Sequence, residues 1–590
     1  MFSMFCQIVK KSLIKIVNFK PLYKYKTMKK IFQNLFTICL FLTGVFSASA
    51  QQWGDYTLYA LQNQYSANLL DTNGNIVKTL TFPASAKTGY STYMLPGGTL
   101  LRSVARTGNS FQGGPICGEV QKVDWNGNVV WDYIYSTANY CSHHDVCAMP
   151  NGNVLLIAYE RKTPTEASAA GCTQSIEIWP DKIVEVQPTS ATTGTVVWEW
   201  RAWDHLIQNV YPAKANYYSS IVDHPELLNI NYNTQKDWMH MNGIDYNPIL
   251  DQIAFSSHNL NEWYIIDHST TTAEAASHSG GNSGKGGDIL YRWGHPVNYS
   301  ATGSSILNVT HDAHWIPEGV PNAGRLVGFN NRGVSNNQSS VDQIDVPRVG
   351  YNYSHTAGAA YLPATYTSRL ACNGYSSNMS NSQQLPNGNQ LVCVATSGLI
   401  YEVNPAGTTI WSKQLTGAAP QSFRYDTCYA NNLAPTIPLI SSAGANTLSA
   451  SLADSYQWYL NGDLLVGETN QTINCTQSGI YLVRITQAPS CSYSYSSGYN
   501  FSLTGISSND NVIKGISFFP NPANEVIKVG GIEKINESYI VNIYSLDGRL
   551  LINAMNAQEI ITDELSNGCY LISLTTESGK TMNQRIIITK

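Results

Sequence analysis

The sequence has 590 residues, enough for about three to five domains, and 43% of them are hydrophobic, which is ample for buried cores. The net charge is −5, and much of the positive charge lies in the first 30 residues, which argues against nucleic acid as a partner. Only 13% of the residues are charged, whereas Gly (45) and Tyr (36) are abundant. This balance is typical of strands and turns, so the composition predicts an all-β chain.

Residues 1–50 are predicted to be an N-terminal extension followed by a secretory signal peptide. Met28-Lys29-Lys30 is a basic start, residues 31–46 are mostly apolar, and Ala48-Ser49-Ala50 offers the small residues that signal peptidase requires. We expect cleavage after Ala50 and a true start at Met28. No later apolar run approaches the ~18–20 residues of a membrane span, so the mature chain is expected to be exported and soluble.

Ten cysteines follow the predicted signal peptide. An even number in an exported chain is compatible with disulfides, although spacing does not give their connectivity. Cys475 and Cys491 fall in one small C-terminal unit and are the pair that we predict. No Cys-x-x-Cys occurs, which argues against a zinc ribbon or a redox pair.

One turn phrase recurs along residues 53–432. An apolar strand end, a Pro-Gly or Pro-Asn-Gly turn and a second apolar strand surround Pro96, Pro150 and Pro386, with looser copies at Pro248 and Pro317. A second hairpin phrase alternates with the first. Two hairpins per repeat make a four-stranded sheet, and sheets of this kind repeated around an axis form a β-propeller.

We therefore expect an all-β fold with a β-propeller of about six blades over residues 53–432, with five or seven as alternatives. The long interval between Pro150 and Pro248 holds either an extra blade or an insertion. An array of β-sandwiches is the competing architecture, but its strands would not keep one turn phrase at recurring offsets.

Two small β-sandwich domains are predicted after the propeller. Residues 436–506 contain Trp458 and Gly479-Ile480-Tyr481, and resemble immunoglobulin-like sandwiches. Residues 510–590 contain the phrase Phe518-Phe519-Pro520-Asn521-Pro522 and closely resemble the type A sorting domain of the type IX secretion system of Bacteroidota. This resemblance implies that the secretion machinery is a partner, and that the chain is exported across the outer membrane and then released or attached to the surface.

All 12 histidines lie in the repeat region, and three take matching places in it. His144 and His311 each stand six residues before the turn proline, and His240 opens the corresponding strand of a looser copy. Because the first strand of each propeller blade lines the central channel, we expect these imidazoles to surround one pocket. His143 and His314 are close neighbours and are alternatives for the same roles.

The segments around these histidines resemble the arylsulfate sulfotransferases, six-bladed propellers that act outside the cytoplasm without a nucleotide sulfate donor. The resemblance implies that His311 is the nucleophile that carries a sulfuryl group and that His144 and His240 assist it. The family has Arg where this chain has His258, so His258 or Arg332 is expected to stabilise charge. The matching segments are 142–145, 238–242 with 253–259, and 310–313, and the second includes Asn242 as a further candidate.

The implied chemistry suits imidazole side chains. A neutral imidazole nitrogen can attack the sulfur of an aryl sulfate, giving an N-sulfo-histidine and a phenol, and a second phenol then takes the group. Fixed donors around the nonbridging oxygens, from His240 with His258 or Arg332, would stabilise the spreading charge. A protonated His144 would deliver a proton to the leaving phenolate. Neither a metal nor an organic cofactor is required.

Two alternative hypotheses fit the same residues. Three histidines can bind Zn²⁺ or Mn²⁺ and support hydrolysis or elimination. A non-catalytic surface propeller could instead bind a glycan or a protein, because a fold alone does not determine function.

Two other features need an interpretation. The glycine-rich residues 279–287 lack the spacing of a P-loop and are predicted to form a flexible loop. Asp145 and Asp312 follow two of the histidines and are expected either to orient them or to hold the turn.

Overall fold

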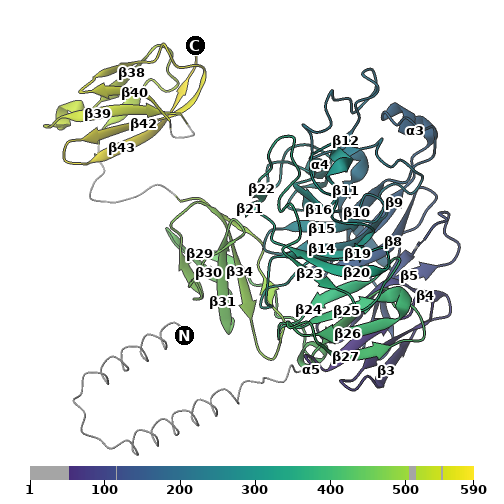
Figure 1. Ribbon diagram of the computed structural model, residues 1–590. Helices are drawn as coiled ribbons and strands as arrows, with labels where there is room; N and C mark the ends of the chain where they lie inside the picture. Colours follow the sequence, from purple (N-terminus) through teal and green to yellow (C-terminus); the bar gives the residue numbers. More distant parts are fainter. Residues whose placement is uncertain (1–51, 115, 504–512, 514, 546–548) are drawn as a thin grey trace, which may run out of the picture. The chain divides into compact units, whose positions relative to one another are not determined.

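The computed structural model describes residues 52–114, 116–503, 513, 515–545 and 549–590 (Figure 1). The predicted extension and signal peptide therefore lie outside the described residues. The chain divides into two compact units, of which the first contains the propeller and the sandwich that ends at Phe501, and the second contains the C-terminal sandwich.

Six four-stranded antiparallel sheets make up the described chain between Tyr56 and Tyr425, and the innermost strand of each contacts its neighbour around a ring. The sheets are, from the innermost strand outward, β28 (Ser422–Tyr425), β1 (Tyr56–Ala60), β2 (Ser66–Leu70), β3 (Ile76–Thr81); β4 (Ala86–Met94), β5 (Leu100–Arg106), β6 (Gly118–Val123), β7 (Val129–Ile134); β8 (Tyr140–Ala148), β9 (Val154–Glu160), β10 (Asp181–Ser190), β11 (Thr193–Arg201); β14 (Met241–Asn247), β15 (Gln252–Ser257), β16 (Glu262–Asp267), β17 (Tyr291–Trp293); β18 (Thr310–Trp315), β19 (Leu326–Ser335), β20 (Gln338–Ile344), β23 (Ser368–Ala371); and β24 (Asn381–Gln384), β25 (Gln390–Val394), β26 (Leu399–Val403), β27 (Thr409–Gln414).

Short elements lie in the connections within and between these sheets and after the last strand of the propeller. They are α3 (Pro164–Ala169), η1 (Ala202–Asp204), β12 (Leu206–Ile207), β13 (Leu228–Asn229), α4 (Thr272–Ala275), η2 (Pro296–Tyr299), β21 (Arg348–Val349), β22 (Asn352–Tyr353), η3 (Ala395–Ser397) and α5 (Thr427–Asn431). The long interval after Pro150 is thus an insertion, residues 202–240, and not an extra blade.

The two turn phrases join the strands that we expected. The proline phrase connects the first and second strands of a blade, where Gly152 and Gly388 adopt φ values of +86° and +88° that favour glycine. The second phrase connects the third and fourth strands. There Asp124 Oδ1 accepts hydrogen bonds from the backbone N–H groups of Asn126 (2.9 Å) and Asn128 (2.8 Å), which holds the tight turn.

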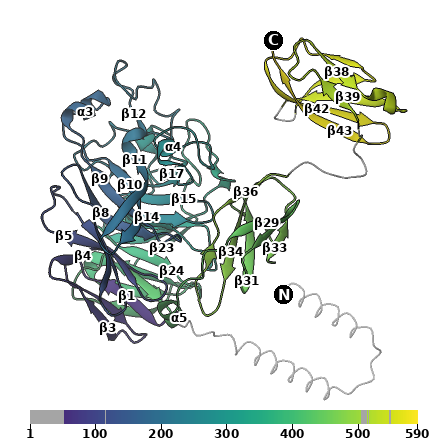
Figure 2. The same ribbon diagram turned by 180° about the vertical axis from the view of Figure 1, so that it is seen from behind.

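The ring closes by pairing the two ends of the propeller chain. β28 pairs antiparallel with β1, with Tyr425 opposite Tyr56, so one blade combines one late strand with three early ones. Figure 1 shows the early strand β3 beside the late strand β27, where Lys413 Nζ donates to the carbonyl of Gly74 (2.8 Å). Figure 2 shows the same join from behind, with β1 close to α5. This closure leaves no free inner edge in the ring.

The sandwich after the propeller has two small sheets with Trp458 fully buried between them. Its disulfide corrects the predicted pairing, because Cys491 is bonded to Cys428 in α5 and not to Cys475. Sequence gave no indication of this pairing, since Cys428 lies at the end of the propeller. The strands are β29 (Ile440–Gly444), β30 (Thr447–Ala450) and β33 (Thr472–Asn474) in one sheet, and β31 (Ser455–Leu460), β32 (Asp463–Leu464), β34 (Gly479–Thr486), β35 (Ser494–Tyr495) and β36 (Tyr499–Phe501) in the other.

The C-terminal unit is a second sandwich, with a core that includes Phe518, Ile543 and Ile572. Within the described ranges, no helix is both long enough and apolar enough to cross a membrane. The strands are β37 (Ser517–Phe519), β38 (Val526–Gly530) and β41 (Glu559–Ile561) in one sheet, and β39 (Tyr539–Tyr544), β40 (Leu550–Met555), β42 (Gly568–Thr576) and β43 (Thr581–Ile588) in the other, with the short helix η4 (Ile532–Lys534) between them.

Candidate active site

The innermost strands of four successive blades are interrupted at corresponding places. The pairing register shifts in β4 after Thr88, in β8 after Ser142, in β14 after Met241 and in β18 after His311. Such bulges bend a strand and redirect its side chains. His144 within one bulge and His240 just before another have φ values of 49° and 55°, which are uncommon for residues other than glycine. The repeat therefore turns these side chains away from regular strand positions.

A cavity of about 470 Å³ lies at this level of the propeller, and all four histidines predicted as catalytic line it: His144, His240, His258 and His311. Their rings form a continuous arc, with centroid distances of 4.5 Å, 5.0 Å and 5.5 Å between successive members. Tyr90 closes the arc, because its ring lies 5.1 Å from His144 and 6.4 Å from His311. The other lining residues are Gln62, Asn63, Gly89, Ala105, Gly113, Gly114, Ile116, Asn378 and Met379.

His311 is held in one tautomer. Its Nδ1 lies 2.7 Å from Oδ1 of Asn331, whose amide nitrogen donates to the carbonyls of Ser376 (2.9 Å) and Met379 (3.1 Å). The amide oxygen must therefore accept from Nδ1–H, which leaves a lone pair on Nε2. The backbone N–H of Met379 donates to that Nε2 (3.0 Å). Burial lowers the pKa of His311 well below its usual value, so the ring is neutral at neutral pH.

His144 ends a buried chain of three titratable groups. Its Nδ1 lies 2.7 Å from Nδ1 of His143, and Nε2 of His143 lies 2.7 Å from Oδ1 of Asp181. Burial, followed by the charge of His240, lowers the pKa of both His143 and His144 well below the usual value. Burial also raises the pKa of Asp181 well above its usual range. A proton entering this chain is therefore stored most easily on the carboxylate.

His240 and His258 have different partners. Nδ1 of His240 lies 2.5 Å from Oδ2 of Asp237, so a protonated His240 would have a counter-ion. Nδ1 of His258 lies 2.7 Å from Oδ1 of Asn259, whose amide nitrogen donates to the carbonyl of Asp237 (2.7 Å). Burial, and then His240, lowers the pKa of His258 to about 4. A neutral His258 in this arrangement keeps a lone pair on Nε2 and is an acceptor.

The four other predicted residues lie outside the cavity lining. Arg332 is exposed and its Nε donates to the hydroxyl of Tyr375 (3.4 Å), although its charge contributes to the lowered pKa of His258. His314 forms an ion pair with Asp312 (3.2 Å). Asn242 is fully buried and donates to the carbonyl of Thr310 (2.7 Å), so it joins neighbouring blades. His143 supports His144 from behind.

The two aspartates that follow the histidines also join blades. Asp145 accepts hydrogen bonds from the Tyr93 hydroxyl (2.8 Å) and the backbone N–H of Ile244 (3.2 Å), and burial raises its pKa to about 7. Asp312 accepts from the Gln421 amide (3.1 Å). None of these bonds reaches His144 or His311, so the expectation that the aspartates orient those two histidines is wrong for the contacts described.

Sequence reasoning missed the groups that fix the tautomers. Asn331 stands beside Arg332, and Asp237 stands three residues before His240, so proximity in sequence could have suggested both. Asp181 lies 38 residues from His143, and nothing in the sequence indicates that the two side chains meet. Only the pairing of β8, β9 and β10 brings them together.

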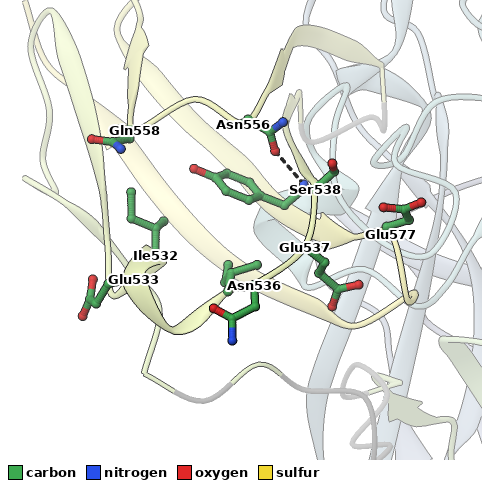
Figure 3. Close-up of a pocket in the computed structure, with 10 residues that line it drawn as sticks. Ile532, Glu533, Asn536, Glu537, Ser538, Asn556, Gln558 and Glu577 are labelled. Atoms are coloured by element: carbon green, nitrogen blue, oxygen red, sulfur yellow. Dashed lines mark hydrogen bonds between the residues drawn. The ribbon is translucent and has the colours of Figure 1, made fainter.

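The structure contains a second, larger hollow of about 920 Å³ in the C-terminal unit. Figure 3 shows it lined by Glu533, Glu537 and Glu577, with Asn556 Oδ1 accepting from the backbone N–H of Tyr539 (2.9 Å). Its lining has no histidine or cysteine, and the hollow is shallow and open. We assign it no chemistry.

The fold and the site together define a six-bladed propeller with a cluster of four histidines around one cavity. The family model for arylsulfotransferase (ASST) matches residues 41–426, and the chain belongs to this family. The model for a secretion system C-terminal sorting domain matches residues 517–589. This domain marks the chain for type IX export to the cell surface or the extracellular space.

Other comparisons add little to this assignment. No match was found among curated proteins. Among solved structures, a Bacteroides caccae protein of unknown function is 11% identical with a TM-score of 0.36, over 63% of this chain and 98% of its own. The periplasmic gluconolactonase PpgL of Pseudomonas aeruginosa is 9% identical with a TM-score of 0.34, over 75% of this chain and 98% of its own. These likenesses are weak, and we draw no argument from them.

Proposed function

We propose that this protein is an exported arylsulfate sulfotransferase that moves a sulfuryl group from an aryl sulfate to a phenol through a sulfo-histidine at His311, without a nucleotide sulfate. The observation that carries the proposal is the arc of four histidines around one cavity, with His311 fixed in the tautomer that leaves Nε2 a lone pair. Membership of the arylsulfotransferase family supports the reaction class.

In the first half-reaction, Nε2 of His311 attacks the sulfur of the donor. The N–S bond forms, the S–O bond to the aryl group breaks, and the phenolate leaves with the electron pair. The Met379 N–H, which donates to this Nε2, must first move aside. In the proposed step it then donates to a sulfuryl oxygen, as fixed backbone donors do in other transfer reactions.

Charge on the sulfuryl oxygens is stabilised by His240 in its protonated form, with Asp237 as counter-ion. The neutral His258 takes a different role from the Arg of the family, because its Nε2 accepts and does not donate.

His144 moves the proton in both half-reactions. It gives a proton from Nε2 to the leaving phenolate and takes one from the attacking phenol, whose oxygen then displaces Nε2 of His311 from sulfur. The proton passes along the chain by a switch of tautomers, from His144 Nε2 through His143 to Asp181. Neither buried imidazole becomes a cation at any stage, which agrees with the direction of their pKa shifts.

The test uses the purified mature chain with 4-nitrophenyl sulfate, following nitrophenolate release with and without added phenol. We expect release to depend on the acceptor, and intact-protein mass spectrometry without acceptor to show the gain of one SO₃ group. In His311→Ala both the turnover and the added mass should disappear. His224→Ala, a partly exposed histidine paired with Glu226, is the matched control and should keep both.

Three outcomes would overturn the proposal. Release that is unchanged in His311→Ala would remove its role as nucleophile. Activity lost in chelator and restored by Zn²⁺ or Mn²⁺ would favour a metal-dependent hydrolase or lyase. Absence of release from a panel of aryl sulfates would favour a propeller that only binds a glycan or a protein.

A further inference from the structure

A second cluster of histidines, outside the cavity, has the composition of a metal site. His205, His278 and Asp288 have ligand atoms that all lie within 4.8 Å of one another. In the part of the chain that the structure describes, no other group of three or more His, Cys, Asp or Glu side chains meets this condition, and the four cavity histidines do not.

Three separate segments bring these residues together. His205 follows η1 at the start of the insertion, His278 follows α4, and Asp288 stands just before β17. The backbone N–H of Gly287 donates to the carbonyl of Ser277 (3.0 Å). Because Asp288 follows Gly287 and His278 follows Ser277, this hydrogen bond fixes the spacing between Asp288 and His278. The site is therefore built by backbone contacts that do not depend on the side chains.

The hydrogen bonds of His205 leave an unmatched lone pair. Its Nε2 lies 2.8 Å from the carbonyl oxygen of Ala275, which can only accept, so Nε2 carries the proton of a neutral ring. Nδ1 then presents a lone pair to Oδ1 of Asp288 at 2.9 Å, and His205 is fully buried. Two acceptors facing each other require a cation between or on them, either a second proton or a metal ion.

The arrangement matches the usual surroundings of a metal-bound histidine. Such a histidine ligates through one nitrogen while the other donates to a carboxylate or a backbone carbonyl, as Nε2 of His205 does to Ala275. Oδ1 of Asp288 lies 2.9 Å from Nδ1 of His205 and 2.7 Å from Nδ1 of His278. Ligands of tetrahedral zinc stand about 3.3 Å apart, so binding requires each of these two pairs to open by only about 0.5 Å. All three ligand atoms lie within 4.8 Å of one another.

We propose that His205, His278 and Asp288 bind one divalent first-row transition-metal ion, with Zn²⁺ as the best match to two imidazoles and one carboxylate. The cluster is accessible from solvent on the side of His278, whose side chain is 58% exposed. The ion lies at a place distinct from the proposed sulfuryl-transfer cavity, and the inference does not depend on that function.

The site also gives a role to the glycine-rich stretch that runs from His278 to Asp288. Gly286 and Gly287 pack so closely against α4 and Ser277 that a Cβ atom at either position would overlap backbone carbonyl oxygens. This packing contrasts with the flexible loop that was expected. A metal ion held at both ends of the stretch closes it as a ring against the insertion.

The experiment strips the purified full-length protein with chelator and adds Co²⁺ or Zn²⁺, measuring bound ion by equilibrium dialysis and the visible absorption of four-coordinate Co²⁺. We expect one tightly bound ion per chain. His278→Ala removes a ligand from the surface and should weaken binding by more than the roughly 10–100-fold that loss of an outer partner costs. Its sulfotransferase activity should be unchanged.

Two controls make the result decisive. His224→Ala removes an imidazole from a similar pair with Glu226 that lacks a third ligand, and should bind the ion like the wild type. His311→Ala should also bind it. The proposal is overturned if the wild type binds no more ion than His278→Ala, or if His311→Ala loses the ion while His278→Ala keeps it.

Discussion

Each histidine of the cavity has one ring nitrogen engaged by a fixed neighbouring side chain, and Nε2 of His311 also accepts from the backbone N–H of Met379. Asn331, His143, Asp237 and Asn259 provide these partners, from 2.5 Å to 2.7 Å away. Four chemically identical side chains thereby become different groups. In the reaction that we propose, these different surroundings assign a different role to each histidine.

Replacing Asp181 with Asn tests the proton chain. Burial raises the pKa of Asp181 well above its usual range, so the carboxylate takes up a proton as the pH falls toward this raised pKa. Once Asp181 is protonated, the chain of His144, His143 and Asp181 cannot accept a proton from a phenol. We expect Asp181→Asn to slow transfer from the sulfo-enzyme to phenol by about 10²–10⁴-fold. Formation of the sulfo-enzyme from 4-nitrophenyl sulfate should change little, because nitrophenolate leaves without a proton.

Single-turnover measurements of the two half-reactions between pH 5 and 9 check this prediction. In the wild type the acceptor step should decline as the pH falls, and in Asp181→Asn that decline should be absent. Asp463→Asn, at an exposed aspartate of the sandwich, is the control. Equal slowing of both half-reactions would contradict the proton chain and indicate a structural role.

At the scale of elements, the blades are held together by buried charged groups as well as by apolar packing. His268, just after β16, bonds to Asp251 in the β14–β15 turn (2.7 Å) and to Glu185 on β10 of the preceding blade (3.1 Å). Burial opposes a positive charge on His268, but the hydrogen bonds to Asp251 and Glu185 outweigh it and raise its pKa to about 9.

This shift predicts a dependence of stability on pH. Because the folded pKa exceeds the unfolded value of about 6.5, the stabilisation is fully present below pH 6.5 and is lost as the pH rises through about 9. The contribution is on the order of 3 kcal/mol. His268→Gln should therefore flatten the fall in unfolding temperature between pH 6.5 and 9, as measured by thermal unfolding at a series of pH values.

In His268→Gln the unfolding temperature is still expected to fall somewhat as the pH rises. The reason is that burial lowers the pKa of His314 but Asp312 and Asp245 outweigh it and raise that pKa to about 9 as well. An unchanged slope in His268→Gln would show that this histidine is not charged in the folded protein. Asp312 and Asp245 would then be the groups to test.

The regular parts of the elements were predictable and the irregular parts were not. Local turn chemistry around Pro96, Pro150 and Pro386 is contained in a few consecutive residues, so the hairpins and the repeat follow from sequence. The bulge that turns His144 toward the cavity depends on packing between blades and leaves no local signal. The pairing of β28 with β1 joins residues 369 positions apart, Tyr56 and Tyr425, and no periodicity reports it.

At the scale of the whole molecule, a disulfide crosslinks the end of the propeller to the sandwich that follows it in the first unit. Cys428 lies in α5 directly after β28, and its disulfide to Cys491 spans 63 residues that include most of the sandwich. Neither cysteine lines the cavity. The bond thus ties the sandwich to the closing strand without touching the reacting groups.

Replacing both cysteines with Ser tests this role. The crosslink is expected to contribute about 2–4 kcal/mol to the stability of the segment that it closes. Cys428→Ser with Cys491→Ser should keep its sulfotransferase activity but become more susceptible to proteolysis between residues 432 and 440. Limited proteolysis with and without reductant provides the measurement. Loss of activity in the oxidised wild type on mild reduction would contradict this separation of roles.

The cavity is complete only once β28 has closed the ring. Gln62 and Asn63 of the first-made segment line it together with Asn378 and Met379 near the end, so neither half of the propeller contains a complete pocket. A chain that is still being synthesised, or only partly exported, lacks the strand that completes the ring. The complete cavity can therefore form only in a chain that includes residue 425 and has paired β28 with β1.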